Sequence, residues 1–134
     1  LHQKAGSKEV LELHGSIYRN YCMKCGKFWP AQEIADSKGI PWCDCGGMIK
    51  PDVVLYEEAL DNDVMRRAIE HIRKADMMIV AGSSLVVYPA AGLINYYKGH
   101  RLVLINRSAT PFDDQADLVV HDTIGKVFGA IEVR

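Results

Sequence analysis

The sequence shows no strong excess of either charge and no long apolar run. Its 16 Lys and Arg residues face 17 Asp and Glu residues, so the net charge is -1 and no basic field is available to attract nucleic acid. No apolar run approaches the ~18 residues of a membrane span, and no signal peptide is visible. These absences argue against a nucleic-acid zinc finger and against a membrane protein, and they predict a cytoplasmic location.

A glycine-rich Gly-x-Gly-x-x-Gly turn, the usual cradle for a pyrophosphate, is also missing. No internal repeat or low-complexity tract is present. With 134 residues, of which 49% are hydrophobic and 25% charged, the chain is nevertheless long enough to bury a core. It opens on Leu1 rather than on Met, and we expect it to be a fragment or to be completed by a separate chain.

What the sequence does have is four cysteines in two tight pairs. Two residues separate Cys22 from Cys25, one separates Cys43 from Cys45, and 17 residues lie between the pairs. Two short turns of this kind can point four thiolates into one volume, as a tetrahedral zinc ion requires. A closed four-thiolate site leaves no position for water or substrate, so the predicted zinc is structural and any catalytic group lies elsewhere.

Two disulfides, or free thiols, are the alternatives to zinc. Bridges within a pair would be strained, and bridges between the pairs would need an oxidising compartment that nothing in the sequence indicates. The second pair has one intervening residue where zinc ribbons usually have two or more, so we expect some distortion of the site. Gly26 and Gly46-Gly47 follow the pairs and would let the chain turn back over the metal.

Short elements are predicted around and after the cysteines. They are an alternating apolar segment at 8–21, a short helix at 30–37, an extended approach at 40–42 and, after Pro51 closes the module, a strand at 53–56. Asp61 is a plausible N-cap for a following helix. The apolar stripe of that helix has helical spacing and consists of Val64, Met65, Ala68, Ile69 and Ile72.

From residue 76 onward, strands and helices alternate. The expected elements are strands at 77–81, 102–105 and 118–120, a helix with Pro89 in its first turn, and a closing helix at 124–133. The run at 77–81 is continuously apolar, as is typical of a parallel strand buried on both faces. The pattern predicts an α/β fold, part of a doubly wound Rossmann-like parallel sheet, together with a small zinc-ribbon module. Ligands bind at the carboxyl ends of such strands, where Gly82-Ser83-Ser84 and Asn106-Arg107-Ser108 stand.

Several sequence motifs match those of one protein family, and they occur in the same order along the chain. Glu12-Leu13-His14-Gly15-Ser16 precedes the cysteine pairs, Lys50 to Glu58 follows them, and Gly82 to Ala91 is the most specific string. The match is completed by Leu1 to Ser7, Asn106, Thr110-Pro111 and Ala116-Asp117-Leu118. The chain therefore resembles the sirtuins, the NAD-dependent protein lysine deacylases, over essentially its whole length. The resemblance implies a catalytic-histidine segment at 1–20, a zinc module at 21–50 and the C-terminal part of a Rossmann-like NAD-binding domain at 51–134.

The resemblance implies that His14 is the general base. It would take a proton from the ribose hydroxyls of NAD after the acyl oxygen of the substrate has displaced nicotinamide. An imidazole suits this task because imidazoles titrate near operating pH. The remaining histidines lack such a context and are interpreted as surface or structural residues; they are His2, His71, His100 and His121.

The resemblance also implies two sets of binding residues. The set expected to contact NAD is Gly82, Ser83, Ser84, Asn106, Arg107, Ser108, Thr123 and Ile124. The set expected to hold an acyl-lysine peptide as an added strand is Val53, Val54, Leu55, Tyr56, Val86 and Tyr88. Ordinary turn chemistry is the alternative for the glycine and serines, and buried core strand is the alternative for the second set.

The family's phosphate loop and Gln-Asn-x-Asp motif would precede Leu1. The expected function is thus NAD-dependent removal of acetyl or other acyl groups from protein lysines, giving nicotinamide and O-acyl-ADP-ribose, in partnership with a missing N-terminal half. Mono-ADP-ribosyl transfer and an inactive zinc-stabilised interaction module are the alternatives. Alone, the chain should expose a sheet edge and an apolar face.

Overall fold

The computed structural model describes residues 1–132. The chain forms two compact units, Leu1–Val64 and a second unit that begins at Met65, and each is described by itself. Val133, the last residue of the predicted closing helix, lies outside the described residues. Within residues 1–132, no helix combines the length and the apolar character needed to cross a membrane.

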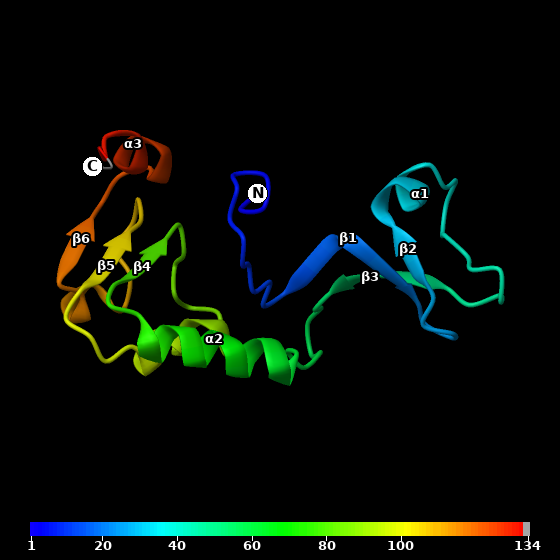
Figure 1. Ribbon diagram of the computed structural model, residues 1–134, viewed down its shortest axis with the longest axis horizontal. Helices are drawn as coiled ribbons and strands as arrows, with labels where there is room; N and C mark the ends of the chain where they lie inside the picture. The colour runs from blue at the N-terminus through cyan, green and yellow to red at the C-terminus, as the bar shows by residue number, and fades with distance from the viewer. Residues whose placement is uncertain (133–134) are drawn as a thin grey trace. The chain divides into compact units, whose positions relative to one another are not determined.

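The first unit is built on a small antiparallel sheet in the order β2-β1-β3. Figure 1 shows β1 (Gly15–Cys22) between β2 (Phe28–Pro30) and β3 (Ile49–Val53). The predicted short helix is confirmed as α1 (Ala31–Ala35). Three buried residues form the core of this unit, with Trp29 and Ile34 packed against them; they are Cys22, Cys43 and Ile49. Two of the three are cysteines, so this core is built around the cysteine cluster.

The strand predicted at 53–56 is wrong beyond Val53. The strand begins at Ile49 and ends at Val53, because its partner β1 begins at Gly15, which lies opposite Val53. Pro51 lies inside β3 instead of closing the module. The proline is tolerated there because β3 is an edge strand, where its missing N–H group is not needed for a second neighbour.

The second unit begins within α2 (Asn62–Lys74). Asp61 is its N-cap, as predicted, because Oδ1 of Asp61 accepts hydrogen bonds from the backbone N–H groups of Asp63 at 2.8 Å and Val64 at 3.0 Å. The predicted sheet is also confirmed. Its three parallel strands are β4 (Met78–Ala81), β5 (Leu102–Ile105) and β6 (Leu118–Val120), in the order β4-β5-β6.

The apolar core of the second unit lies on one face of this sheet. Leu104, which is 1% exposed, packs in it together with Met78 and Val80. The opposite face carries Ile79 and Leu118, which are aligned through β5 and are 47% and 54% exposed. The expectation that residues 77–81 are buried on both faces is therefore wrong for this chain, because the second face leaves Ile79 exposed and is covered only at its carboxyl end, where Ile105 is 2% exposed. The expected exposed apolar face is confirmed.

Two of the predicted helices differ from expectation. The segment after Pro89 is a 3-10 helix, η1 (Ala90–Tyr96), whose buried side chains are Ala91 and Ile94. The closing helix α3 covers Ile124–Gly129 and is shorter than predicted. A second 3-10 helix, η2 (Asp113–Gln115), lies between β5 and β6.

Candidate functional site

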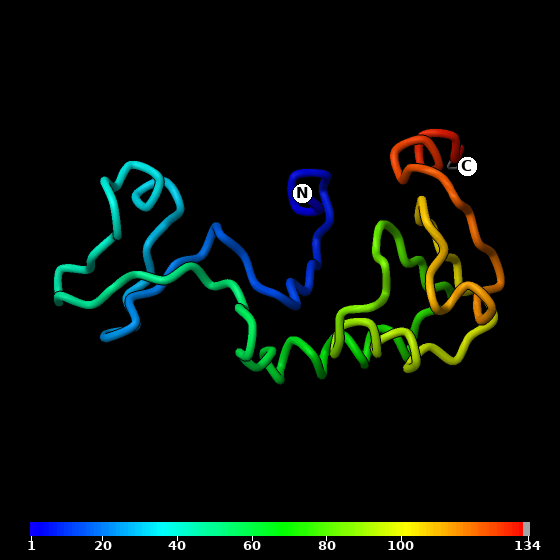
Figure 2. Tube along the Cα trace, turned by 180° about the vertical axis from the view of Figure 1, so that it is seen from behind, coloured from blue at the N-terminus to red at the C-terminus, as the bar shows by residue number. Residues whose placement is uncertain are grey.

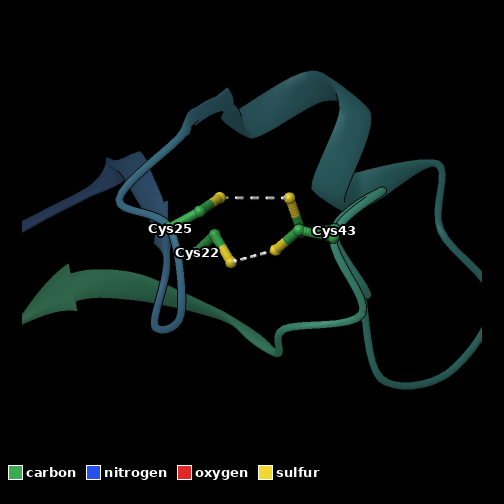
Figure 3. A group of neighbouring side chains, drawn as sticks. Cys22, Cys25 and Cys43 are labelled. Carbon is green, nitrogen blue, oxygen red and sulfur yellow. Dashed lines mark hydrogen bonds between the residues drawn. The ribbon is translucent and has the colours of Figure 1, made fainter.

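The four cysteine side chains converge in the first unit. Cys22 ends β1 and Cys25 lies in the turn that follows, while Cys43 and Cys45 lie in the loop before β3. All four Sγ atoms lie within 4.8 Å of one another. Across the two pairs, the Sγ atoms are 3.5 Å apart for Cys22 and Cys45 and 3.7 Å apart for Cys25 and Cys43, as the dashed lines in Figure 3 mark.

These separations fit a tetrahedral zinc ion. Zinc–sulfur bonds of about 2.3 Å place the sulfur atoms of a tetrahedral site about 3.8 Å apart, close to the spacings of both pairs. All four cysteines are free in the structure, so the disulfide alternative is not what is observed. The single residue between Cys43 and Cys45 does not prevent both sulfur atoms from joining the cluster. Four protein ligands close the site, so zinc would act there as a structural ion.

The proton affinities of the thiols point the same way. Backbone N–H groups, first that of Cys25 and then that of Lys24, lower the pKa of the Cys22 thiol to about 6. The neighbouring Cys25 and Cys22 side chains raise the pKa of the Cys45 thiol to about 12. Crowded thiols of this kind resist further ionisation because each new negative charge faces another. A divalent cation between them removes that obstacle, which is why zinc and thiolates form together.

Lys27 ties the two cysteine turns to each other. Its ammonium group lies 2.6 Å from the carboxylate of Asp44, the residue between Cys43 and Cys45 in the sequence. The same group lies 4.4 Å from the centre of the Trp29 ring. The Nζ atom of Lys24 also donates to the carbonyl oxygen of Cys45 at 3.2 Å. The chain thus holds the two ligand pairs together through contacts that do not use the metal.

His14 stands directly before β1, with an exposed side chain. Its backbone is fixed on two sides. The N–H group of Gly15 donates to the carbonyl oxygen of Glu12 at 2.9 Å, and the N–H group of Val54 donates to the carbonyl oxygen of His14 at 3.1 Å. The imidazole is therefore presented to solvent from a held turn, which suits a group that must meet a substrate.

Gly15 makes that turn possible. Its φ angle is +77°, and a Cβ atom built on it would lie 1.8 Å from the carbonyl oxygen of Asp52. Gly15→Ala should therefore destabilise the first unit by at least about 2 kcal/mol and disturb His14. Urea unfolding of the variant measures the loss. Gly39→Ala is the matched control, because Gly39 has a φ angle of +79° but no atom within 4 Å of its Cβ position. Equal losses in the two variants would show that the contact with Asp52 has no effect.

The residues predicted to contact NAD gather at the carboxyl ends of the parallel strands. Gly82 follows β4, and its N–H group donates to the carbonyl oxygen of Ile105 at 2.9 Å. Asn106 follows β5, and its N–H group donates to the carbonyl oxygen of Val120 at 3.1 Å. A Cβ atom on Gly82 would lie 2.5 Å from Cδ1 of Ile124. The structure therefore brings Gly82 and Ile124 together, although they are 42 positions apart in the sequence.

The remaining members of that set are exposed on the same loops. Ser83, Ser84, Arg107, Ser108 and Thr123 are all exposed. Ser83 also shapes its own loop, because its Oγ atom accepts a hydrogen bond from the N–H group of Leu85 at 3.2 Å. Leu85 is buried at a φ angle of +55°, so it anchors the loop in the core while the serines stay outside.

A small polar network beside Asn106 could not be predicted from the sequence. Nε2 of His121 lies 3.2 Å from the carboxylate of Asp113, and Nδ1 of the same ring lies 3.2 Å from the carbonyl oxygen of Asn106. Asp113 also accepts hydrogen bonds from Thr110, at 3.0 Å from its N–H group and 2.6 Å from its hydroxyl. The Thr110-x-x-Asp113 spacing could have suggested the turn, but nothing local links it to His121. His121, interpreted from the sequence as a surface or structural residue, therefore braces the loop that carries Asn106.

The residues predicted to hold a substrate peptide are mostly exposed. Leu55 is 56% and Tyr56 101% exposed in the first unit, and Val86 is 60% and Tyr88 66% exposed in the second. Buried core strand, the alternative for this set, therefore does not describe these four residues. Lys50 and Glu58 shape the first of the two segments. The Glu58 carboxylate accepts a hydrogen bond from the N–H group of Leu55 at 2.9 Å and forms an ion pair with Lys50 at 2.8 Å.

Comparison with known proteins decides the family. The model described as the Sir2 family matches residues 1–89. An NAD-dependent protein deacetylase of Clostridium perfringens is 62% identical over 133 residues, which are 98% of this chain and 54% of that protein. The chain belongs to the Sir2 family. It spans about half the length of the curated relatives that it matches.

Solved Sir2 structures share the fold. The structure of Sir2Tm bound to a propionylated peptide is 42% identical with a TM-score of 0.87, covering 95% of this chain and 56% of that one. A Sir2 structure with a p53 peptide and NAD+ is 43% identical with a TM-score of 0.86, covering 95% of this chain and 55% of that one. The predicted sirtuin resemblance and the predicted α/β class with a cysteine module are both confirmed.

Proposed function

We propose that this chain is the zinc-bearing and C-terminal NAD-binding part of an NAD-dependent protein lysine deacylase. One observation carries the proposal: the 62% identity to an NAD-dependent protein deacetylase, which extends over 98% of the chain. The part of the relatives' length that this chain does not span would complete the NAD pocket. It would also cover the exposed face of the parallel sheet around Ile79 and Leu118.

His14 is the proposed catalytic base, and its exposed ring on a held turn supports that role. NAD, when bound, supplies the electrophilic ribose carbon and the hydroxyl groups that receive the acyl group. The imidazole takes the proton from a ribose hydroxyl, and this makes the oxygen a better nucleophile toward the acyl carbon.

The carboxyl ends of β4 and β5 are the proposed NAD-binding edge. Parallel α/β sheets bind ligands there. Gly82 lets the chain approach the cofactor closely, Ser83 and Ser84 offer hydroxyl groups, and Asn106 offers an amide to a ribose. Arg107, Ser108, Thr123 and Ile124 complete this edge in the proposal, and the contact between Gly82 and Ile124 supports their grouping.

The proposed substrate is an acylated lysine in a protein. Solved relatives have been described with a propionylated peptide and with a p53 peptide. The exposed segment that contains Leu55 in the first unit offers apolar side chains for the lysine stem, and so does the exposed segment that contains Tyr88 in the second unit. The proposal includes a cytoplasmic location, because a compartment that keeps thiols reduced favours four clustered cysteines as zinc ligands over disulfides.

The test is an assay of the zinc-loaded protein at the full length of its curated relatives. An acetyl-lysine peptide is incubated with and without NAD, and peptide and nicotinamide are followed by chromatography. The proposal predicts loss of the acetyl group only with NAD, together with release of nicotinamide. ADP-ribose attached to protein with the acetyl group still on lysine would favour mono-ADP-ribosyl transfer. Absence of any NAD turnover would favour an inactive module.

The network around Asp113 yields a prediction about NAD affinity. Asp113→Asn weakens the contacts to His121 and Thr110 that brace the Asn106 loop, so the KM for NAD should rise about five- to tenfold, equivalent to about 1–1.4 kcal/mol. Asp114→Asn is the matched control, because Asp114 is the exposed neighbour of Asp113 in η2. Steady-state kinetics with NAD as the varied substrate provides the measurement. An unchanged KM for NAD in Asp113→Asn would contradict the prediction.

A further inference from the structure

Arg19 joins two acidic side chains that lie on either side of the His14 turn. Its Nε atom donates to the carboxylate of Asp52 at 2.7 Å, and its Nη1 atom donates to the carboxylate of Glu12 at 2.5 Å. Glu12 precedes His14 by two residues, whereas Asp52 lies in β3 opposite Ser16. A guanidinium group presents its donors in a rigid planar fork, so one Arg can hold two carboxylates at fixed positions.

The backbone places Arg19 for this task. The register between β1 and β3 shifts between Ser16 and Asn20, so Arg19 lies within an irregular stretch of β1, and such irregularities redirect side chains. This stretch is held by Asn20, which is 2% exposed and donates from its amide to the carbonyl oxygens of Ile17 at 3.2 Å and Trp29 at 3.3 Å. The orientation of Arg19 is therefore built into the strand.

Glu12 extends the connection to the N-terminal residues. Its second carboxylate oxygen accepts a hydrogen bond from the amide of Gln3 at 3.0 Å. Gln3 lies in the N-terminal turn at residues 1–7, which Figure 2 shows as the first part of the trace. The N–H group of Ser7 donates to the carbonyl oxygen of His2 at 3.0 Å and closes this turn. A continuous chain of charge-assisted bonds therefore runs from Asp52 through Arg19 to Glu12 and on to Gln3.

The electrostatics favour a durable contact. The side chains of Arg19 and Glu12 are 39% and 23% exposed, so water screens the pair less than it screens a fully exposed one. The hydrogen bond from Arg19 is the largest cause that lowers the pKa of Glu12. Because the folded pKa is lowered, Glu12 stays ionised throughout the neutral range, and the contact weakens only as pH falls through that lowered value.

We infer that Arg19 is a positioning residue for the proposed base His14. This inference rests on the function proposed above. Arg19 anchors Glu12 to β3, and the Gly15 N–H group is bonded to the carbonyl oxygen of the same Glu12, so a shift of Glu12 moves the turn that presents the imidazole. A displacement of about 1 Å at a catalytic group can cost about 100-fold in rate. Nothing in this role requires Arg19 to touch NAD or the peptide.

The kinetic test uses Arg19→Met in the zinc-loaded protein at the full length of its relatives. The kcat for deacylation should fall about 10- to 100-fold, with the KM for NAD and the zinc content unchanged. Arg19→Lys should recover part of the loss, because one ammonium group can reach one carboxylate but lacks the fork that holds two. Arg66→Met is the matched control, since it breaks the Arg66–Glu70 pair, 2.7 Å long, on the exposed side of α2.

A second variant keeps the test decisive if Arg19→Met does not fold. Glu12→Gln removes the charge at the other end of the bond with little change in shape, and it should lower kcat in the same way. Combining it with Arg19→Met should cost no more than the larger single effect, because Arg19→Met already removes the Arg19–Glu12 contact that Glu12→Gln weakens. Wild-type kcat in either single variant, or losses that add in the double variant, would overturn the inference.

A readout that does not depend on activity separates this inference from the proposed function. Hydrogen exchange of the backbone N–H groups at residues 12–15 should speed up in Arg19→Met, while exchange in β5 stays unchanged. If the wild-type protein does not deacylate, the proposed function fails, and the exchange data still report whether Arg19 holds the turn. If the wild-type protein is active and exchange at 12–15 is the same in Arg19→Met, only the positioning role fails.

Discussion

Replacing His14 by Ala should lower NAD-dependent deacylation by about 10²- to 10⁴-fold, the usual contribution of a positioned general base. The exposed ring stands on a turn fixed by Gly15 and Val54, so removing it should leave the fold intact. The zinc content and the KM for NAD should both stay at wild-type values. Steady-state kinetics on an acetyl-lysine peptide, with zinc measured on the same sample, provides the comparison.

The position of the base in the reaction sharpens this prediction. In the proposed function, His14 acts after nicotinamide has left, so the variant should lose deacylation more strongly than it loses exchange of labelled nicotinamide into NAD. His100→Ala is the matched control, because His100 is exposed and lies at the start of the chain leading into β5, away from the proposed NAD-binding edge. Wild-type deacylation in His14→Ala would show that the assigned base is wrong.

Loss of a zinc ligand should have the largest effect on folding. Two of the three buried core residues of the first unit are cysteines of the cluster, and structural zinc supplies roughly 10–16 kcal/mol in small zinc domains. Cys22→Ser or Cys45→Ser should therefore abolish zinc binding and unfold the β2-β1-β3 sheet. The second unit has a separate core around Leu104. Hydrogen exchange should accordingly lose protection in β1 and β3 while β5 keeps it.

Elemental analysis should find one zinc ion per wild-type chain and none in either cysteine variant. Met23→Ser is a suitable control, because Met23 adjoins Cys22 but its side chain is 68% exposed. Activity should be lost in the cysteine variants only as a consequence of unfolding. A Cys22→Ser protein that stays folded and keeps its zinc would contradict the ligand set.

The sequence predicted the elements whose causes are local. The N-cap at Asp61, the short helix after Pro30 and the three parallel strands were all anticipated, because a cap, a helical start and an apolar run depend on adjacent residues. The end of β3 depended on where its partner β1 begins, which no local pattern reveals. The burial of both faces at 77–81 was wrong because an apolar run shows what a strand can bury, not what covers it.

The candidate site was predictable in its chemistry and not in its connections. Four cysteines at short spacing imply a cluster, and the strand ends imply a ligand-binding edge. The bonds from Arg19 to Glu12 and Asp52 join residues 7 and 33 positions apart, and they depend on a register shift in β1 that no sequence pattern predicts. The contact of His121 with Asp113 likewise appears only once β6 lies beside β5.

The fate of the acyl group distinguishes NAD-dependent deacylation from simple hydrolysis and from mono-ADP-ribosyl transfer. The zinc-loaded protein, at the full length of its curated relatives, is given NAD and a peptide whose lysine carries an isotopically labelled acetyl group, and the products are identified by mass spectrometry. For NAD-dependent deacylation, we expect one labelled O-acetyl-ADP-ribose for each nicotinamide released and each lysine freed. Labelled free acetate formed without consumption of NAD, or ADP-ribose on protein while the label stays on lysine, would contradict it.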